Sequence, residues 1–383
     1  MTKVALVASS FLPRVGGVEE HVANVAVRLR DRGHDVVIWA VDQGDGTLRE
    51  HHGIRVRYLP CPLPNRSLGG LLRFARELPD ARRAWIHALR GDRPDVLHVQ
   101  CYGPNGIYAD WLARRGRLPL VYSHHGETFA DADGAFEVSA LLRTRLSATL
   151  ERAVAVTSVS RWAARDLERF GFAADGVRVV YNGVDPDEPV GPPPPGLPDR
   201  YVLGIGRLAR NKGFDVLVRA FAHIAHEPEL RGVGLVIGGD GPEAAALTEL
   251  ASESGIADRV TMVGRLARPQ VGGVIRSAAQ LVVPSRVEAF GIAVLEGWRA
   301  GIPVLATNHG GPPEFATDGV DVVLIDPDDD AGVAEAMRRV LLDPADAAAL
   351  GRGGAARLRE FTWDSVAEAY ERLYRTTITA PSS

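Results

Sequence analysis

Short apolar runs alternate with stretches of helical periodicity along most of the chain. Val4–Ala8 is an apolar run followed by a loop with glycines, and residues 19–33 then carry apolar positions at helical spacing and end at Gly33. A second apolar run at Asp35–Val41 completes a strand–loop–helix–strand unit. The same pattern predicts further strands at Val96–Val99, Leu120–Tyr122, Val154–Val159 and Val177–Tyr181.

The alternation is interrupted by a proline-dense segment, residues 185–199 (DPDEPVGPPPPGLPD). Proline at this density cannot continue a helix or a central strand, so we expect a linker. Beyond it the alternation starts again, with strands predicted in YVLGIG, GLVIGGD, RVTMVG, QLVVPS, IPVLAT and DVVLID. Strands that alternate with helices predict parallel sheets covered on both faces.

The expected fold class is therefore α/β, with two Rossmann-like domains facing across a cleft. We place the first domain at residues 1–184, the linker at 185–199 and the second domain at 200–362. An amphipathic helix, residues 363–379, closes the chain. Its periodicity leaves open whether it packs on the second domain or returns to the first.

Composition narrows the class of protein. The 383 residues exceed what one core usually supports, and 46% are hydrophobic without any apolar run near twenty residues, which indicates a soluble protein of two domains. The first residues read as a strand, not as a signal peptide. Two cysteines, Cys61 and Cys101, provide no disulfide framework and indicate a reducing, cytoplasmic location. The net charge of −4 argues against a nucleic-acid-binding protein.

Open parallel sheets bind ligands at the carboxyl ends of their strands. In the second half these ends carry glycines and basic residues, including Arg265 after RVTMVG and the loop GRLARNKG after YVLGI. Lysine occurs in this chain only at positions 3 and 212, and Lys212 shares that loop with Arg207. The guanidinium of Arg207 and the ammonium of Lys212 at a helix start would suit binding of a diphosphate. The alternative is that both are solvated basic residues on a surface loop.

The segment EAFGIAVLE places two acids, Glu288 and Glu296, on either side of Phe290-Gly291-Ile292. Gly291 is expected near the start of a helix that ends at Gly301, so Glu288 lies before the helix and Glu296 inside it. The two acids therefore do not form a catalytic pair acting on one bond. They flank the free backbone amides of a helix start, which can bind an anion such as a diphosphate. Carboxylates on either side of that anion can bind the hydroxyl groups of the sugar and the ribose attached to it. The alternatives are an acid that complements the helix dipole at 288 and a surface residue at 296.

These segments resemble the signatures of one known family. EAFGIAVLE with the following AGIPV resembles the E-x7-E motif of retaining glycosyltransferases of the GT-B fold, family GT4. GRLARNKG (206–213) and GGPPE (310–314) resemble the GRL…KG and GG-x-PE segments of that family. In the first half, Gly16-Gly17 with RGH (32–34), HHG (124–126) and NGVD (182–185) are similar to its remaining motifs, and the order is the same over nearly the whole chain.

The resemblance implies roles for individual residues. The catalytic residues would be His125, Glu288, Arg207 and Lys212. The donor would be held by Gly16, Gly17, Arg207, Lys212, Arg265, Phe290, Gly291, Ile292 and Glu296. In this assignment Arg207 and Lys212 neutralise the leaving diphosphate, Glu288 binds sugar hydroxyls and Glu296 binds the ribose. His125 fits the histidine near the anomeric carbon because Gly126 follows it, with His124 as the fallback.

The implied function is transfer of a hexosyl group (glucosyl, N-acetylglucosaminyl or mannosyl) from a nucleoside-diphosphate sugar to an acceptor hydroxyl with retention, UDP being favoured over GDP. No cofactor and no metal is expected. Asp326-Pro327-Asp328 is a D-x-D, but its acidic loop is typical of a helix N-terminus. The alternatives are a sugar-nucleotide epimerase or hydrolase of the same fold, or a non-catalytic sugar-nucleotide binding protein. An NAD enzyme is disfavoured because the first loop lacks G-x-G-x-x-G.

The acceptor and the oligomeric state stay open. The acceptor could be a small molecule or a lipid. The basic stretch Leu71–Arg90 could form an amphipathic surface at the inner face of a membrane. We favour the alternative, an arginine-rich helix that packs its apolar side on the core, and Pro79 argues against a continuous membrane helix.

Overall fold

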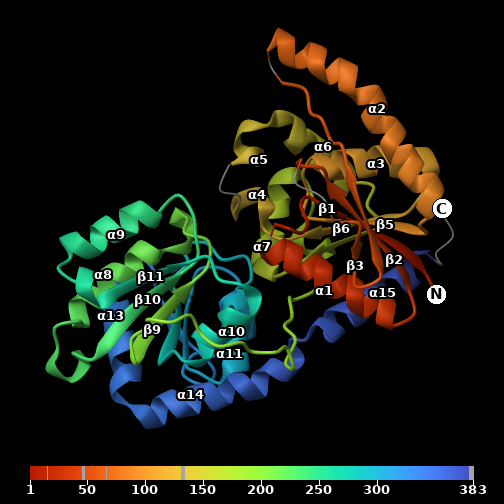
Figure 1. Ribbon diagram of the computed structural model, residues 1–383. Coiled ribbons are helices and arrows are strands. Elements are labelled where there is room, and N and C mark those ends of the chain that lie inside the picture. Colours follow the sequence, from red (N-terminus) through yellow and green to blue (C-terminus); the bar gives the residue numbers. More distant parts are fainter. Residues whose placement is uncertain (15, 45–47, 66, 131–133, 379–383) are drawn as a thin grey trace. The chain divides into compact units, whose positions relative to one another are not determined.

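The computed structural model describes residues 1–14, 16–44, 48–65, 67–130 and 134–378. The chain divides into two compact units (Figure 1). The first unit contains Met1–Asn182 and the C-terminal segment that starts at Trp363, and the second unit contains Gly183–Thr362. Both are built from a sheet and helices, as the alternating pattern predicted. None of the helices in the described part of the chain is long and apolar enough to cross a membrane.

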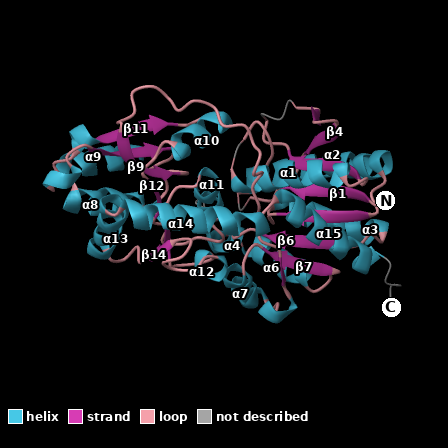
Figure 2. Ribbon diagram, turned by 90° about the horizontal axis from the view of Figure 1, so that it is seen from below, coloured by secondary structure: helices cyan, strands magenta, loops and turns pink. Residues whose placement is uncertain are grey.

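The first unit contains an eight-stranded sheet in the order β3-β4-β2-β1-β5-β6-β7-β8. All neighbouring strands are parallel except β3 and β4. The strands are β1 (Lys3–Ala8), β2 (Asp35–Val41), β3 (Glu50–His51), β4 (Ile54–Leu59), β5 (Val96–Gln100), β6 (Leu120–His124), β7 (Ala155–Ser158) and β8 (Arg178–Val179). The strand order reverses at β1, and β8 is shorter than the apolar run suggested. In Figure 2 the strands of this unit lie together with helices running along them.

Strand β4 was not predicted from the apolar pattern. Its sequence IRVRYL alternates with arginines, and it lies near the edge of the sheet. Arg55 and Arg57 both pair with the buried carboxylate of Asp92, at 3.0 and 2.6 Å. The charged positions of this strand are therefore neutralised by a partner far along the chain, which the local sequence cannot reveal.

The helices of the first unit cover this sheet. They are α1 (Gly17–Asp31), α2 (Leu68–Asp92), α3 (Pro104–Gly116), α4 (Glu127–Ala130), α5 (Ala135–Val138), α6 (Ala140–Leu150), α7 (Arg161–Arg165) and α15 (Trp363–Ile378). The C-terminal helix α15 lies beside α1 (Figure 1), where the Tyr370 hydroxyl is 3.0 Å from His21 Nε2 and Arg32 pairs with Glu371 at 2.9 Å. The last helix of the sequence thus completes the first unit.

Helix α2 is continuous through Pro79. A proline removes one N–H bond to the carbonyl four residues earlier, here Ala75. Both Ala75 and Pro79 are exposed, so water can satisfy that carbonyl. The second half of α2 packs on the core through Ala81, Trp85 and Ala88, whereas the first half is largely exposed.

The second unit contains a six-stranded parallel sheet in the order β11-β10-β9-β12-β13-β14. Its strands are β9 (Arg200–Ile205), β10 (Val233–Gly238), β11 (Val260–Gly264), β12 (Gln280–Val283), β13 (Val304–Thr307) and β14 (Val323–Ile325). Its helices are α8 (Phe214–Ile224), α9 (Ala244–Glu253), α10 (Arg268–Arg276), α11 (Ile292–Ala300), α12 (Pro312–Phe315), α13 (Asp330–Leu342) and α14 (Pro344–Arg357). Helix α8 packs against α9 and α13, and α11 packs against α10 and α14, so helices form two groups about the sheet (Figure 1). The strand order reverses between β9 and β12, and ligands of such sheets bind at the carboxyl ends of the strands at this point.

Candidate functional site

Lys212 and Glu288 meet where the second sheet reverses its strand order. Lys212 belongs to the loop after β9, and Glu288 to the loop after β12. Lys212 Nζ lies 2.8 Å from Glu288 Oε2, and Ser285 Oγ donates to the same oxygen at 2.9 Å. Glu288 is 8% exposed. The structure therefore brings together a cation and an acid that are 76 residues apart in the sequence.

Two glycines allow the loops around this pair to touch through their backbones. Gly213, with a φ of +68°, lies so close to Pro284 that an added Cβ would be 2.0 Å from the Pro284 carbonyl oxygen. Gly310, with a φ of +121°, would place a Cβ 2.0 Å from the Glu288 carbonyl oxygen. That oxygen also accepts a hydrogen bond of 2.9 Å from Gly311 N. Glycine is thus needed at positions 213 and 310, because a side chain at either position would push apart the loops that carry Lys212 and Glu288.

The start of α11 follows Glu288 directly. Gly291 is the N-cap residue with a φ of +105°, and no side chain caps the helix. The first amides of a helix have no partner within it, so this start presents N–H groups near the Lys212–Glu288 pair. Phe290 is buried and stacks on Phe315 with ring centroids 4.5 Å apart, which fixes the turn that precedes α11.

The two remaining predicted cations, Arg207 and Arg265, are exposed on the loops after β9 and β11. The loop of Arg207 is fixed by its neighbours, because Gly206 N donates to Gly238 O at 3.0 Å and Leu208 N to Asp240 O at 2.8 Å. Within the described part of the chain neither guanidinium forms an ion pair. Both side chains are therefore able to bind an anion at this edge of the sheet.

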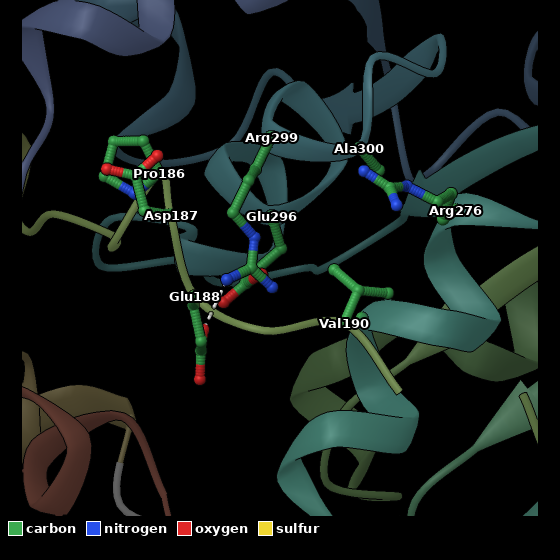
Figure 3. A pocket seen from close by; sticks show the side chains of 9 residues that line it. Pro186, Asp187, Glu188, Val190, Arg276, Glu296, Arg299 and Ala300 are labelled. Atoms are coloured by element: carbon green, nitrogen blue, oxygen red, sulfur yellow. Dashed lines mark hydrogen bonds and ion pairs between the residues drawn. The ribbon is translucent and has the colours of Figure 1, made fainter. Parts of the chain in front are cut away.

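Glu296 is buried in α11 and held by two arginines. It is 4% exposed, with Oε1 2.6 Å from Arg268 and Oε2 2.6 Å from Arg299. Both arginines also pair with Glu188 of the proline-rich segment. A pocket of about 300 Å³ adjoins this cluster, and Figure 3 shows Glu188, Glu296 and Arg299 among its lining residues. Burial opposes ionisation of Glu188, but the hydrogen bonds and charges of Arg268 and Arg299 outweigh it and hold the pKa of Glu188 below its usual value.

The sequence did not predict this cluster. Only Arg299 carried a local signal, because it lies three residues after Glu296 on the same helix. Arg268 and Glu188 come from segments far away in the sequence. The alternative that Glu296 is a surface residue is wrong, because it is buried.

The two histidines after β6 have different surroundings. His124 is buried, and its Nε2 lies 2.8 Å from Thr128 Oγ1. His125 is only partly buried; its Nε2 lies 2.8 Å from Gln100 Oε1, and its backbone N–H donates to Glu127 Oε2 at 2.8 Å. Of the two, His125 is therefore the one with solvent access at the carboxyl edge of the first sheet.

A buried polar network surrounds His125. His21 Nδ1 lies 2.7 Å from Asn182 Oδ1, His98 Nδ1 lies 2.6 Å from the Tyr374 hydroxyl, and the Tyr370 hydroxyl bonds His21. Burial lowers the pKa of His21 to about 4 and that of His98 to about 3. Burial, together with the neighbouring histidines, also holds the pKa of His125 well below its usual value. No local sequence pattern predicts that tyrosines of the last helix reach this network.

Gly16 and Gly17 lie at the start of α1 and are exposed. Gly16 is the N-cap residue in an extended conformation, with a φ of −166°, and no side chain caps the helix. Glu19 and Glu20 occupy the first turn, and the Ser10 hydroxyl bonds Glu19. This helix start therefore combines free amides with two carboxylates, a less favourable setting for an anion than the start of α11.

The acidic loop before α13 forms a helix cap, as predicted. Asp329 is the N-cap residue of α13, and its Oδ1 accepts a hydrogen bond of 2.9 Å from Gly332 N. Asp326 and Asp328 are exposed, and His309 Nε2 lies 3.5 Å from Asp326 Oδ1. These three groups lie within 4.8 Å of one another and could reach a metal ion, a combination that the sequence did not suggest because His309 follows another strand.

Comparison with known proteins agrees with this arrangement. Residues 15–188 match the model of the family described as Glycosyltransferase Family 4, and residues 193–357 match that described as Glycosyl transferases group 1. The D-inositol 3-phosphate glycosyltransferase 1 of Catenulispora acidiphila is 30% identical over 95% of this chain and 91% of its own length. The chain belongs to the group 1 glycosyltransferases. A D-inositol 3-phosphate glycosyltransferase of Streptomyces avermitilis is 32% identical over 94% of the chain and 82% of its own length.

Solved structures show the same fold for this glycosyltransferase. The sucrose-phosphate synthase of Thermosynechococcus elongatus superimposes with a TM-score of 0.81 at 24% identity, covering 98% of this chain and 99% of that one. The Anabaena protein HepE, solved in complex with UDP, gives a TM-score of 0.77 at 21% identity, with 98% and 100% coverage. The glycosyltransferase has the GT-B fold with two Rossmann-like domains, as expected from its sequence.

Proposed function

We propose that this glycosyltransferase moves a hexosyl group from a nucleoside-diphosphate sugar to an acceptor hydroxyl with retention of configuration. The transferred group is glucosyl, N-acetylglucosaminyl or mannosyl, and UDP is preferred over GDP. The observation that carries the proposal is the Lys212–Glu288 pair at the reversal point of the second sheet, next to the uncapped start of α11. HepE, a protein of the same fold, has been solved with UDP-glucose, which supports UDP as the first donor to test.

The positive groups at the carboxyl ends of the strands in the second sheet suit binding of a diphosphate. Lys212 already neutralises Glu288, so a bound diphosphate would be a second anion for the same ammonium group, and Arg207 is free to approach it. The amides at Gly291 and Ile292 add donors that point out of the helix start. Cations and amides fixed before the reaction stabilise the charge that develops on a departing diphosphate, which is usually a large part of the catalytic effect.

The two carboxylates bind the hydroxyl groups of the donor on either side of its diphosphate. We assign Glu288 to the sugar and Glu296 to the ribose. Glu296 is held by Arg268 and Arg299, so its carboxylate keeps a fixed orientation. Phe290 and Arg265 complete the donor site. Because Arg207, Arg265 and the amides at the start of α11 add positive potential beyond the Lys212 ammonium that Glu288 shares, we propose that departure of the diphosphate needs no metal ion.

His125, Gly16 and Gly17 keep the roles implied by the family resemblance, and each lies at a carboxyl end of the first sheet. His125 remains neutral at physiological pH because burial lowers its pKa. It would therefore act as a hydrogen-bond partner of the sugar, not as a cation. Several relatives are named for D-inositol 3-phosphate, so phosphorylated polyols belong in the first acceptor screen.

Substitution of the central pair tests the proposal. We expect Glu288→Gln and Lys212→Ala each to lower turnover of a UDP-sugar by about 10²–10³-fold, the range for loss of one charge-stabilising group. Release of UDP with a panel of acceptors, in EDTA and in Mg²⁺, measures the effect. Lys3→Ala is the matched control, because Lys3 is the other lysine of the sequence and pairs with Asp35 at 2.7 Å in the first unit.

The outcomes separate the candidate functions. Near-normal turnover of Glu288→Gln would contradict its role. An isomerised nucleotide sugar formed without acceptor would indicate an epimerase. Donor binding without any turnover would indicate a binding protein.

A further inference from the structure

Helix α2 carries one apolar stripe that the core covers only in part. Its members recur at spacings of three and four residues, which places them on one helical face: Leu71, Phe74, Leu78, Ala81, Trp85 and Ala88. Ala81, Trp85 and Ala88 are each 1% exposed, whereas Leu71 is 45% exposed and Phe74 and Leu78 are only partly buried. In Figure 1 the first part of α2 extends away from the strands of its unit. The same face is thus buried at one end and open at the other.

The open end of the stripe lines an apolar pocket of about 250 Å³ within the first unit. The pocket lies between α2, the segment after β4, α3 and α6. Its apolar lining consists of Pro62, Leu63, Pro64, Phe74, Leu78, Ile107, Tyr108, Trp111 and Leu141. Residues 62–64 follow β4, and α3 follows β5, so the pocket adjoins the carboxyl edge of the first sheet. A concave site lined mainly by aliphatic and aromatic side chains is typical of a ligand pocket.

The remaining lining residues give the pocket a positive rim. Arg82, Arg114 and Arg145 are exposed at its edge. Of the described lining residues one is acidic, Asp110. Its carboxylate forms ion pairs with Arg114 at 3.2 Å and with Arg152 at 2.7 Å. Arg82 lies over the Trp111 ring at 5.2 Å. In the described part of the chain no carboxylate pairs with Arg82 or Arg145, so the rim has an excess of positive charge.

We propose that this pocket binds the hydrocarbon chain of a phosphorylated amphiphile, which is the acceptor of the transfer reaction. The apolar wall would cover an alkyl or prenyl chain, and the guanidinium groups would bind its phosphate. A neutral apolar compound would leave the rim charge unmatched. A second copy of the chain, related by two-fold symmetry through this surface, would bring arginines against arginines. The inference rests on the proposed function and names its acceptor class.

Titration with dodecyl phosphate below its micelle concentration tests the proposal, with dodecyl maltoside and inorganic phosphate as comparison ligands. Tryptophan fluorescence is a suitable signal, because Trp111 lines the pocket. We expect saturable binding of dodecyl phosphate, at least tenfold weaker binding of dodecyl maltoside, and no binding of inorganic phosphate in the same range. Leu78→Gln and Arg145→Glu should each weaken the binding at least tenfold.

Leu72→Gln is the matched control. Leu72 belongs to the same helix and is 73% exposed, but it lies off the stripe and does not line the pocket. The Kd of this variant for dodecyl phosphate should stay within twofold of that of the unchanged chain. An equal loss in Leu72→Gln and Leu78→Gln would mean adsorption to the helix surface, as at a membrane, and would overturn the proposal.

Three further results would also overturn it: no saturable binding of dodecyl phosphate, equal binding of dodecyl maltoside, or self-association of the chain that Leu78→Gln abolishes in sedimentation. UDP binding, measured in parallel, separates this inference from the proposed function. Retained UDP binding without dodecyl phosphate binding contradicts the acceptor class alone, whereas loss of UDP binding contradicts the donor site.

Discussion

His21 and His125, two neighbouring histidines of the first unit, have one consistent set of hydrogen-bond roles. Asn182 Oδ1 can only accept, so His21 Nδ1 donates and His21 Nε2 accepts from the Tyr370 hydroxyl. In the same way, Gln100 Oε1 accepts from His125 Nε2–H, which leaves His125 Nδ1 as a free acceptor. Gln100 is fully buried at the end of β5, so it orients His125 without being exposed itself.

Gln100→Leu tests this assignment. Loss of the acceptor would free His125 to change tautomer, and we expect kcat to fall about tenfold, which corresponds to about 1.4 kcal/mol and lies near the upper end for one hydrogen bond. Ring ¹⁵N shifts should show the Nε2–H form of His125 in the unchanged chain and a mixture in the variant. Gln280→Leu is the control, because Gln280 is an equally buried amide in the second unit. Identical His125 shifts and kcat in Gln100→Leu would refute the role of Gln100.

At the scale of elements, backbone contacts between loops position the donor residues. Gly310 and Gly319 both have positive φ, +121° and +72°, but only Gly310 touches a neighbour: an added Cβ would lie 2.0 Å from the Glu288 carbonyl oxygen, whereas nothing lies within 4 Å at Gly319. Both positions incur the backbone strain of a side chain at positive φ. Only a change at Gly310 would also displace Glu288.

We therefore expect Gly310→Ala to lose turnover at least tenfold and Gly319→Ala to keep it. Both variants should lose about 1 kcal/mol of unfolding free energy from backbone strain, and Gly310→Ala a further ~1–3 kcal/mol from the clash. Urea unfolding and UDP release measure the two effects. Equal turnover in the two variants would show that the contact with Glu288 does not position it.

The elements differ in how far the sequence reveals them. The parallel strands were predictable because both faces of such a sheet are buried and their sequences are continuous apolar runs, as at Val4–Ala8. β4 was missed because its arginines are neutralised by Asp92 of α2. Continuity of α2 through Pro79 could not be predicted, because it depends on exposure of Ala75, which local sequence does not determine.

The candidate site was predictable to a similar extent. The motifs pointed to Lys212 and Glu288, and strand order brings them together. The arginines that hold Glu296, and the tyrosines of α15 beside His21 and His98, come from segments remote in sequence. No periodicity or motif connects such segments, so only the folded chain reveals these contacts.

At the scale of the whole molecule, the first unit should make stability depend on pH. Burial lowers the pKa of His21 to about 4 and of His98 to about 3, whereas unfolded histidines titrate near 6.5. Below pH 6.5 the unfolded chain therefore binds more protons, and stability falls as the pH falls. Each histidine should contribute a slope of about 1.4 kcal/mol per pH unit between roughly pH 6 and 4.

Urea unfolding between pH 5 and 8 checks this prediction. The unfolding free energy should be at its full value above pH 7 and decline toward pH 5. In His98→Gln, the slope of the unfolding free energy against pH should correspond to about one proton fewer taken up on unfolding. This holds whatever the absolute stability of the variant. A free energy that is constant from pH 7 to 5 would mean that these histidines are not kept neutral by burial.

The central claim is that the second unit binds a nucleoside diphosphate through Lys212 and its neighbours. Calorimetric titration of the protein with UDP, GDP and NAD in EDTA tests it most directly. We predict saturable binding of one of the two diphosphates, with UDP preferred, no binding of NAD, and clear weakening in Lys212→Ala but not in Lys3→Ala. Binding of NAD while neither diphosphate binds would contradict the assignment of the donor.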